Sequence, residues 1–284
     1  MNYFKILGFG AAMTLSLGSF AQEQSTTAAS NPSARPIPES DIMYRKTVWR
    51  TIDLREKQNK PFFADGRQIT KVIIDAVKRG ELPIYKNDSL TTTLTQQEFT
   101  TNMVIPEEGG GMSDQEKALG FDEPASSDDG WGNAGGSEAV AMGPAEFFPK
   151  DLYQMELKED AIFDKKRSRM YHDIKSVTLV VPASLKANVK GRDIPVGTFK
   201  YSDLVKVFRD HPKEALWFNP QNDAQHKNLA DAFDLRLFSS FITKVSNPDN
   251  ASLEDIYGGP QQGILAAQTT AEQMIEYEYN LWSF

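Results

Sequence analysis

Residues 106–146 are the longest stretch of this chain without a hydrophobic period. They contain nine Gly, ten Asp or Glu and a single Lys. Because such a segment cannot bury enough apolar surface to offset the entropy of folding, we interpret it as an acidic, Gly-rich linker or loop. Its sequence SSDDGWGN also lacks the spaced carboxylates and closing Glu of a calcium-binding loop. The core must therefore come from residues 40–105 and 147–284, as one interrupted domain or as two.

The N-terminus predicts export from the cytoplasm. One Lys precedes a short apolar stretch that ends in the small residues Ser19 and Ala21. This order is typical of a signal peptide over residues 1–21, cleaved near Ala21. The alternative is an uncleaved anchor, but the stretch is short for a membrane-spanning helix, which needs roughly 20 residues. Residues 22–39 are small, polar and Pro-containing, which predicts a flexible tail.

The cysteine and charge content restrict the class of exported protein. The chain has no cysteine, so it has no disulfides and no lipid-anchoring thiol, and we expect a periplasmic protein with an ordinary hydrophobic core. It carries 31 basic and 39 acidic residues, a net charge of −8. Nucleic acid demands a basic face, so the acidic balance argues against a nucleic-acid partner.

The segment 40–58 opens the N-terminal part, which we predict to be helical. Tyr44, Val48 and Ile52 recur at four-residue spacing among charged side chains. This spacing indicates a helix with one apolar stripe.

Further helices are predicted from periodicity in the same part of the chain. Residues 68–79 carry apolar side chains at helical spacing, and Gly80 is suited to the position after a helix end. Residues 82–88 read as a short extended piece, and residues 94–103 as a shorter helix.

Residues 147–284 combine strand and helix patterns. Strands are expected over 151–163, 170–183 and 214–220, with a charged turn or short helical hairpin over 159–170. Helices are expected after a turn within 192–212, over 228–248 and over 266–284. The sequence as a whole therefore predicts an α+β fold with a helical N-terminal part, the linker, and a mixed helix–strand C-terminal part.

No known catalytic or metal-binding motif is recognisable in the sequence. There is no thiol, and none of the three histidines stands in a known hydrolase or metalloprotease motif. We expect no cofactor, no metal ion and no catalytic residue. The alternative is a periplasmic enzyme or small-ligand binder in which His172, Asp160 or Asp164 lines a pocket.

Aromatic and arginine residues at the ends of predicted elements are the remaining signal. Trp, Tyr and Arg are the usual anchors of protein interfaces, although they are also common in cores. For Trp49 we favour the core, because large aromatic side chains are mostly buried. The candidate residues for packing or partner contact are Trp49, Arg50, Asp53, Arg55, Arg167, Arg169, Arg236, Phe238, Trp282 and Phe284.

Several long segments resemble the GldN family, called PorN in some Bacteroidetes. The resemblance begins with VWRTIDLREKQN (48–59) and the following ITKVIIDAVKRGELPIY and LTQQEF. It continues through residues 157–182 and 222–247 to IYGG and the terminal YNLWSF. These segments occur in the family's order over nearly all of the chain from about residue 40, apart from the acidic linker.

The resemblance implies a non-enzymatic, structural protein of the type IX secretion and gliding-motility machinery. Its expected partners are an outer-membrane lipoprotein of the GldK/PorK type and the periplasmic part of an inner-membrane motor protein of the GldM/PorM type. The family implies self-association in a periplasmic ring with the lipoprotein, no membrane span of its own, and a role in protein export and, in some species, gliding.

Overall fold

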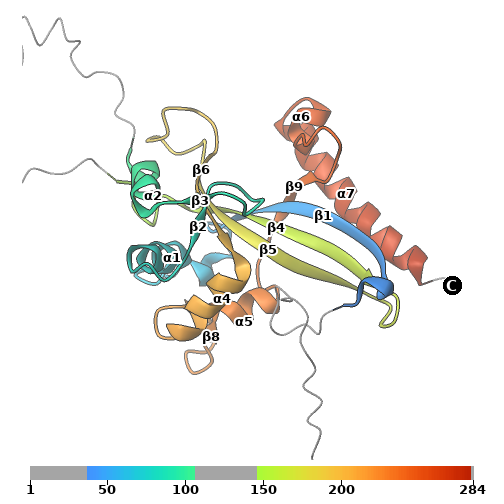
Figure 1. Ribbon diagram of the computed structural model, residues 1–284, viewed down its shortest axis with the longest axis horizontal. Helices are drawn as coiled ribbons and strands as arrows, with labels where there is room; N and C mark the ends of the chain where they lie inside the picture. The colour runs from blue at the N-terminus through green and yellow to red at the C-terminus, as the bar shows by residue number, and fades with distance from the viewer. Residues whose placement is uncertain (1–36, 106–145, 283–284) are drawn as a thin grey trace, which may run out of the picture.

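A seven-stranded antiparallel sheet organises the protein (Figure 1). The computed structural model describes residues 37–105 and 146–282. The strand order is β3-β2-β6-β5-β4-β1-β9, and β7 and β8 form a separate two-stranded sheet. The strands are β1 (Ile42–Asp53), β2 (Ile84–Tyr85), β3 (Thr93–Leu94), β4 (Gln154–Asp164), β5 (Arg169–Val181), β6 (Ile194–Lys200), β7 (Leu216–Trp217), β8 (Lys227–Asn228) and β9 (Phe241–Val245).

The helices form two groups, which pack against different parts of this sheet. Residues of α1, α2, α4 and α5 pack with β4, β5 and β6 in the main core, whereas α6 and α7 pack against β9 and β1. The helices are η1 (Glu39–Asp41), η2 (Lys60–Phe62), α1 (Ile69–Lys78), α2 (Gln96–Met103), α4 (Tyr201–Asp210), α5 (Leu229–Asp234), α6 (Leu253–Tyr257) and α7 (Pro260–Leu281). The predicted α+β class is confirmed.

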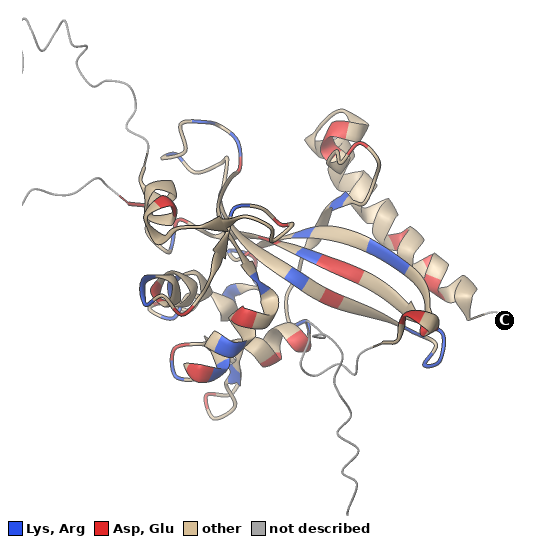
Figure 2. Cartoon of the chain, viewed as in Figure 1, with Lys and Arg blue, Asp and Glu red and all other residues tan. Residues whose placement is uncertain are grey.

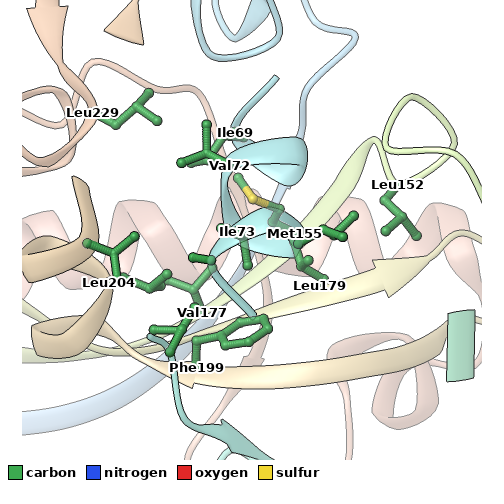
Figure 3. Close-up of a cluster of buried hydrophobic side chains, with 14 of the residues drawn as sticks. Ile69, Val72, Ile73, Leu152, Met155, Val177, Leu179, Phe199, Leu204 and Leu229 are labelled. Carbon is green, nitrogen blue, oxygen red and sulfur yellow. The ribbon is translucent and has the colours of Figure 1, made fainter. Parts of the chain in front are cut away.

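The main hydrophobic core lies between the sheet and α1. Apolar side chains of α1, which precedes the acidic segment, face residues of strands that follow it, as Figure 3 shows for Ile73, Met155 and Val177. Because strands alternate their side chains, only one face of β4 is apolar in this region, and Glu156 and Lys158 lie on the other face. The sheet is thus covered on one face and polar on the opposite one.

The predicted helix over 40–58 is wrong, because residues 42–53 form strand β1. This strand pairs antiparallel with β4 along its length and with β9 near its middle. The four-residue spacing of Tyr44, Val48 and Ile52 is a multiple of two, so it fits one face of a strand as well as a helix. The β-branched and aromatic content of YRKTVWRTI favours the strand. The N-terminal part is therefore not all helical.

Two C-terminal segments also differ from the sequence prediction. The helix expected over 228–248 ends at Asp234, and β9 begins at Phe241. Arg236 has φ 51°, a left-handed conformation that prevents the helix from continuing beyond its six residues. Residues 194–200, expected as a turn, form β6 between β5 and β2.

The remaining predicted elements are present. Helix α1 is followed by Gly80, whose φ of 75° is the left-handed geometry expected after a helix end. A tight charged turn joins β4 to β5, in which Asp164 accepts hydrogen bonds from the backbone N–H groups of Lys166 (2.8 Å) and Arg167 (3.3 Å). The terminal helix is confirmed as α7, which begins earlier than predicted, at Pro260.

The two ends of the acidic segment lie side by side. Val104 and Glu146 form an antiparallel bridge, and Phe147 N donates to Met103 O. The predicted signal peptide and most of the predicted tail and linker lie outside the described residues. None of the described helices is both long and apolar enough to cross a membrane.

Candidate functional site

A buried carboxylate, Glu159, sits in the middle of β4 and gathers three cationic or titratable side chains. Arg50 of β1 donates from Nε to Oε1 at 2.5 Å. Arg236, from the turn after α5, donates to Oε2 at 2.7 Å and to Oε1 at 3.4 Å. His172 of β5 places Nδ1 3.3 Å from Oε1. We call these four residues the Glu159 cluster.

The pKa of the Glu159 carboxyl lies well below its usual range. Burial alone would raise this pKa, but contact with His172 and the charges of Arg236 and Arg50 outweigh that effect. The left-handed backbone at Arg236 turns the chain back toward β4. The cluster therefore ties β1, β4, β5 and the segment after α5 to one carboxylate.

A second cluster surrounds Trp49 on the opposite face of the sheet. Trp49 is 7% exposed, and its Nε1 donates to Asp88 Oδ2 at 2.8 Å. Lys158 Nζ lies 3.2 Å from the same carboxylate. Lys244 Nζ lies 4.0 Å from the centre of the Trp49 ring, within the range of a cation–π contact. Trp49 is therefore buried among residues of its own chain.

The Trp49 hydrogen bond can be tested without removing the ring's bulk. Replacing Trp49 with Phe deletes the donor to Asp88, and we expect the free energy of unfolding to fall by about 1.5 kcal/mol. Trp217→Phe is the matched control, because Trp217 Nε1 is buried without a hydrogen-bond partner among the described residues. Urea unfolding measures both variants. Equal losses would show that the hydrogen bond contributes nothing beyond ring packing.

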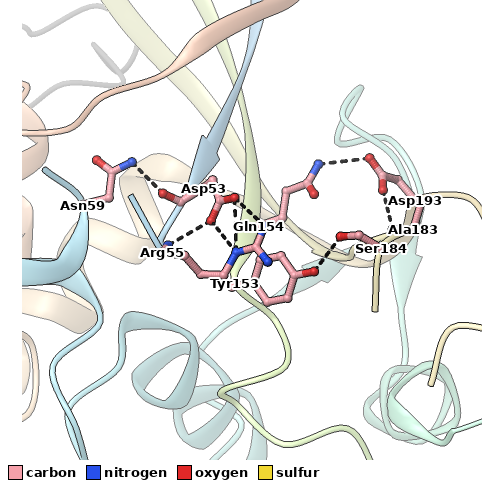
Figure 4. Close-up of polar contacts among 8 residues, drawn as sticks. All are labelled: Asp53, Arg55, Asn59, Tyr153, Gln154, Ala183, Ser184 and Asp193. Carbon is pink, nitrogen blue, oxygen red and sulfur yellow. Dashed lines mark hydrogen bonds and ion pairs between the residues drawn. The ribbon is translucent and has the colours of Figure 1, made fainter. Parts of the chain in front are cut away.

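The Asp53–Arg55 pair closes the end of β1 (Figure 4). Arg55 Nη2 lies 2.7 Å from Asp53 Oδ2, and the guanidinium group lies 3.7 Å from the centre of the Tyr153 ring. Burial raises the pKa of Asp53, but the hydrogen bonds and charge of Arg55 outweigh it, so this pKa is lowered. The pair is partly exposed, and it fixes the chain direction after the strand.

A groove separates the Glu159 cluster from α7. Its volume is about 430 Å³, and Arg50, His172 and Arg236 line one side of it. Met274 and Ile275 of α7 line the other side. Of the three residues named for an enzymatic or ligand-binding pocket, His172 lines this groove, whereas Asp160 and Asp164 do not.

The two aspartates are engaged elsewhere. Asp160 accepts a hydrogen bond from Thr47 at 2.7 Å on the opposite face of the sheet, and Lys175 lies 3.7 Å from it. Asp164 stabilises the β4–β5 turn, as described above. The structure therefore does not bring His172, Asp160 and Asp164 together.

Basic residues cluster at the tip of the β4–β5 hairpin (Figure 2). Arg167 pairs with Asp164 at 3.4 Å, and its guanidinium group lies 5.7 Å from the Tyr171 ring centre. Arg169 begins β5 and is exposed. Of these two candidate residues, only Arg169 presents an exposed side chain without a charged partner among the described residues.

The last candidate residues divide between core and surface. Phe238 packs against the main core, with its ring centre 5.5 Å from that of Phe233. Trp282 is exposed at the end of α7. Phe284 lies outside the described residues.

The most exposed apolar surface was largely missed by the sequence reasoning. Eight large apolar side chains are exposed on α6, α7 and the residue after α7: Ile256, Tyr257, Ile264, Leu265, Ile275, Tyr277, Tyr279 and Trp282. Extended apolar surface of this kind marks interaction sites in soluble proteins. The signal was present in the aromatic residues near the C-terminal end of the predicted helix, but the apolar residues at its beginning were not considered.

Residues 37–283 match the family model described as gliding motility associated protein GldN. A search of curated proteins found no match.

Proposed function

Because the chain belongs to the GldN family of gliding motility associated proteins, we propose that it is a structural, non-enzymatic part of a periplasmic ring. Membership associates the chain with gliding motility and with type IX secretion, as a periplasmic component. In the proposed assembly the chain binds an outer-membrane lipoprotein of the GldK/PorK type. It also contacts the periplasmic part of a motor protein of the GldM/PorM type, so that it couples the motor to protein export.

The exposed apolar surface of α6 and α7 is the observation that carries the proposal. Helix α7 has 22 residues, but only Gly263, Ala266 and Ala267 of it are buried. A helix that exposes most of its large apolar side chains gains stability by covering them with another protein. A structural component of a large assembly needs such surfaces to contact its neighbours.

The polar clusters support the same role. Glu159 is neutralised by two arginines, and Trp49 and Lys158 share Asp88. Charged groups paired in this way brace the sheet, whereas a general acid or base needs a reactive group directed at a substrate. We propose that these clusters hold the docking surfaces in fixed positions.

Export is the remaining part of the proposal. A signal peptide over residues 1–21, cleaved near Ala21, would deliver the chain to the periplasm. Attachment to the lipoprotein would then keep it beside the outer membrane.

Co-expression with the lipoprotein partner tests the proposal. Affinity purification of the lipoprotein is expected to recover the chain in an assembly much larger than a one-to-one pair, measured by light scattering. An unrelated outer-membrane lipoprotein is the control. Recovery of monomers alone, without co-purification, would overturn the proposed function.

A further inference from the structure

Four large apolar side chains lie along the solvent side of helix α7 and at its end. Ile264, Ile275, Tyr279 and Trp282 are 64%, 67%, 74% and 59% exposed. At 3.6 residues per turn, their spacing places them on one side of the helix and its end. We call these four residues the α7 stripe. The α7 stripe lies beside the face of the helix that packs against β9, and it does not overlap that face.

Acidic side chains border this stripe. By helical spacing, Glu272 and Glu276 lie close to it on the helix surface. Residues 260–281 contain no Lys or Arg, as the colouring of α7 in Figure 2 shows. Glu272 accepts a hydrogen bond from Gln268 at 3.0 Å, and within the described part of the chain neither glutamate has a cation in ion-pair range. Two α7 stripes placed face to face would oppose like charges, so a two-fold pairing of this helix is disfavoured.

A complementary groove lies beside η2 and β7. It has a volume of about 810 Å³, and its apolar walls are Pro61, Ala64, Phe218 and Pro220. Phe218 N donates to Pro61 O at 3.0 Å, which holds the two walls together. The groove is therefore a formed apolar depression that admits large side chains.

The rim of this groove is basic. Lys57, Lys60 and Arg67 line it, and no described acid lies within ion-pair distance of their side chains. Asp65, the acid at the rim, is paired with Lys150 at 2.8 Å. We call the residues of the rim and walls the 57–67/218–220 groove.

We infer that the α7 stripe of one copy docks into the 57–67/218–220 groove of a second copy. The stripe supplies apolar and aromatic side chains with an acidic border, and the groove supplies apolar walls with a basic border. In Figure 1, α7 and β8, the partner strand of β7, lie on opposite sides of the molecule, so the two surfaces can engage two different neighbours.

A contact between two different surfaces is heterologous. It propagates from copy to copy and closes into a ring if the rotation permits, or otherwise forms a filament. The inference rests on the self-association in the proposed function, and it specifies the surfaces and the head-to-tail direction.

Cysteine cross-linking tests the direction of the contact, since the natural chain has no cysteine. The full chain carrying both Ile275→Cys and Ala64→Cys is co-expressed with the lipoprotein partner and treated with a short bis-maleimide. We expect a ladder of covalent multimers beyond the dimer. Each single variant should give no ladder. Efficient dimers from Ile275→Cys alone would show a two-fold α7 contact and overturn the inference.

Charge reversal gives a second measurement that does not depend on cross-linking geometry. Glu272→Lys with Glu276→Lys, or Lys57→Glu with Lys60→Glu, should each lower the multimer fraction at least about tenfold, because like charges then meet. Combining all four changes should restore it. Lys186→Glu with Lys190→Glu is the matched control and should leave the multimer unchanged.

The outcomes separate this inference from the proposed function. Co-purification with the lipoprotein in a large assembly that neither reversal affects would overturn the inference and leave the proposed function intact. Reversals that lower the multimer fraction without rescue by the fourfold variant would show that the groove and the stripe meet other partners, such as the acidic segment 106–145. That result would also overturn the inference.

Discussion

Replacing Glu159 with Ala should lower the free energy of unfolding by about 3–5 kcal/mol, the cost of breaking a buried ion pair by removing one partner. The change leaves Arg50 and Arg236 facing each other without their shared carboxylate. For a chain of this size the melting temperature should fall by roughly 10 °C. Thermal unfolding followed by circular dichroism measures the effect.

The matched control is the exposed pair at the end of β1. Asp53→Ala removes a carboxylate from Arg55, whose side chain is more than half exposed, so we expect a loss of at most about 1 kcal/mol. If Glu159→Ala and Asp53→Ala lower stability equally, the Glu159 cluster does not brace the sheet.

The pH dependence of this contribution follows from the lowered pKa of Glu159. The pKa of the unfolded carboxyl is near its ordinary value of 4.5, and the pKa of the folded carboxyl is lower. The unfolded state therefore binds the proton first as pH falls, so the stabilisation is present above pH 4.5 and is lost progressively as the pH falls from there toward the lower folded pKa. The difference in unfolding free energy between the natural chain and Glu159→Gln should be larger near neutral pH than at about pH 3.

The fold class and most elements were predictable because their local patterns allow one interpretation. Helix α1 has apolar residues at three- and four-residue steps and a Gly at its end, which only a helix explains. Strand β1 was predicted as a helix because Tyr44, Val48 and Ile52 satisfy both periods. Its identity as a strand depends on pairing with β4, which is separated from it by about 100 residues. Contacts over such distances leave no local trace in one sequence.

The contacts of the candidate residues were likewise not predictable from the local sequence. Arg50 and Arg236 were selected as possible anchors by residue type, but nothing in the sequence indicated that both meet Glu159. Glu159 is adjacent to Asp160 in the sequence, and the strand places these neighbours on opposite faces of the sheet. The exposed side chains of α7 could have been found by extending the helical period back to Ile264.

The assembly surfaces and the internal clusters occupy different places in the fold. Glu159, Trp49 and their partners lie within the sheet, whereas the α7 stripe and the 57–67/218–220 groove lie at its periphery. Variants of the clusters should therefore change folding stability first. Variants of the surfaces should change assembly with little effect on unfolding, since exposed substitutions usually alter stability by less than about 0.5 kcal/mol.

Phe233→Ala should also destabilise the protein by about 3–5 kcal/mol, the usual cost of truncating a buried aromatic side chain. Phe233 is 2% exposed, and its ring lies within 5.4–6.5 Å of four other aromatic ring centres. These rings come from η2, α4 and the segment after α5: Phe62, Tyr201, Phe208 and Phe238. Truncation therefore opens a cavity where three segments meet.

Phe241→Ala is the matched comparison, and it separates the observed structure from the helix predicted over 228–248. On that helix Phe233 and Phe241 would share one buried stripe, and their truncations would cost similar amounts. In the structure Phe241 starts the edge strand β9 and is 42% exposed, so its truncation should cost less than about 1 kcal/mol. Urea unfolding of the two variants measures the difference. Similar losses would favour the continuous helix, whereas a difference of at least about 2 kcal/mol follows from the break at Arg236.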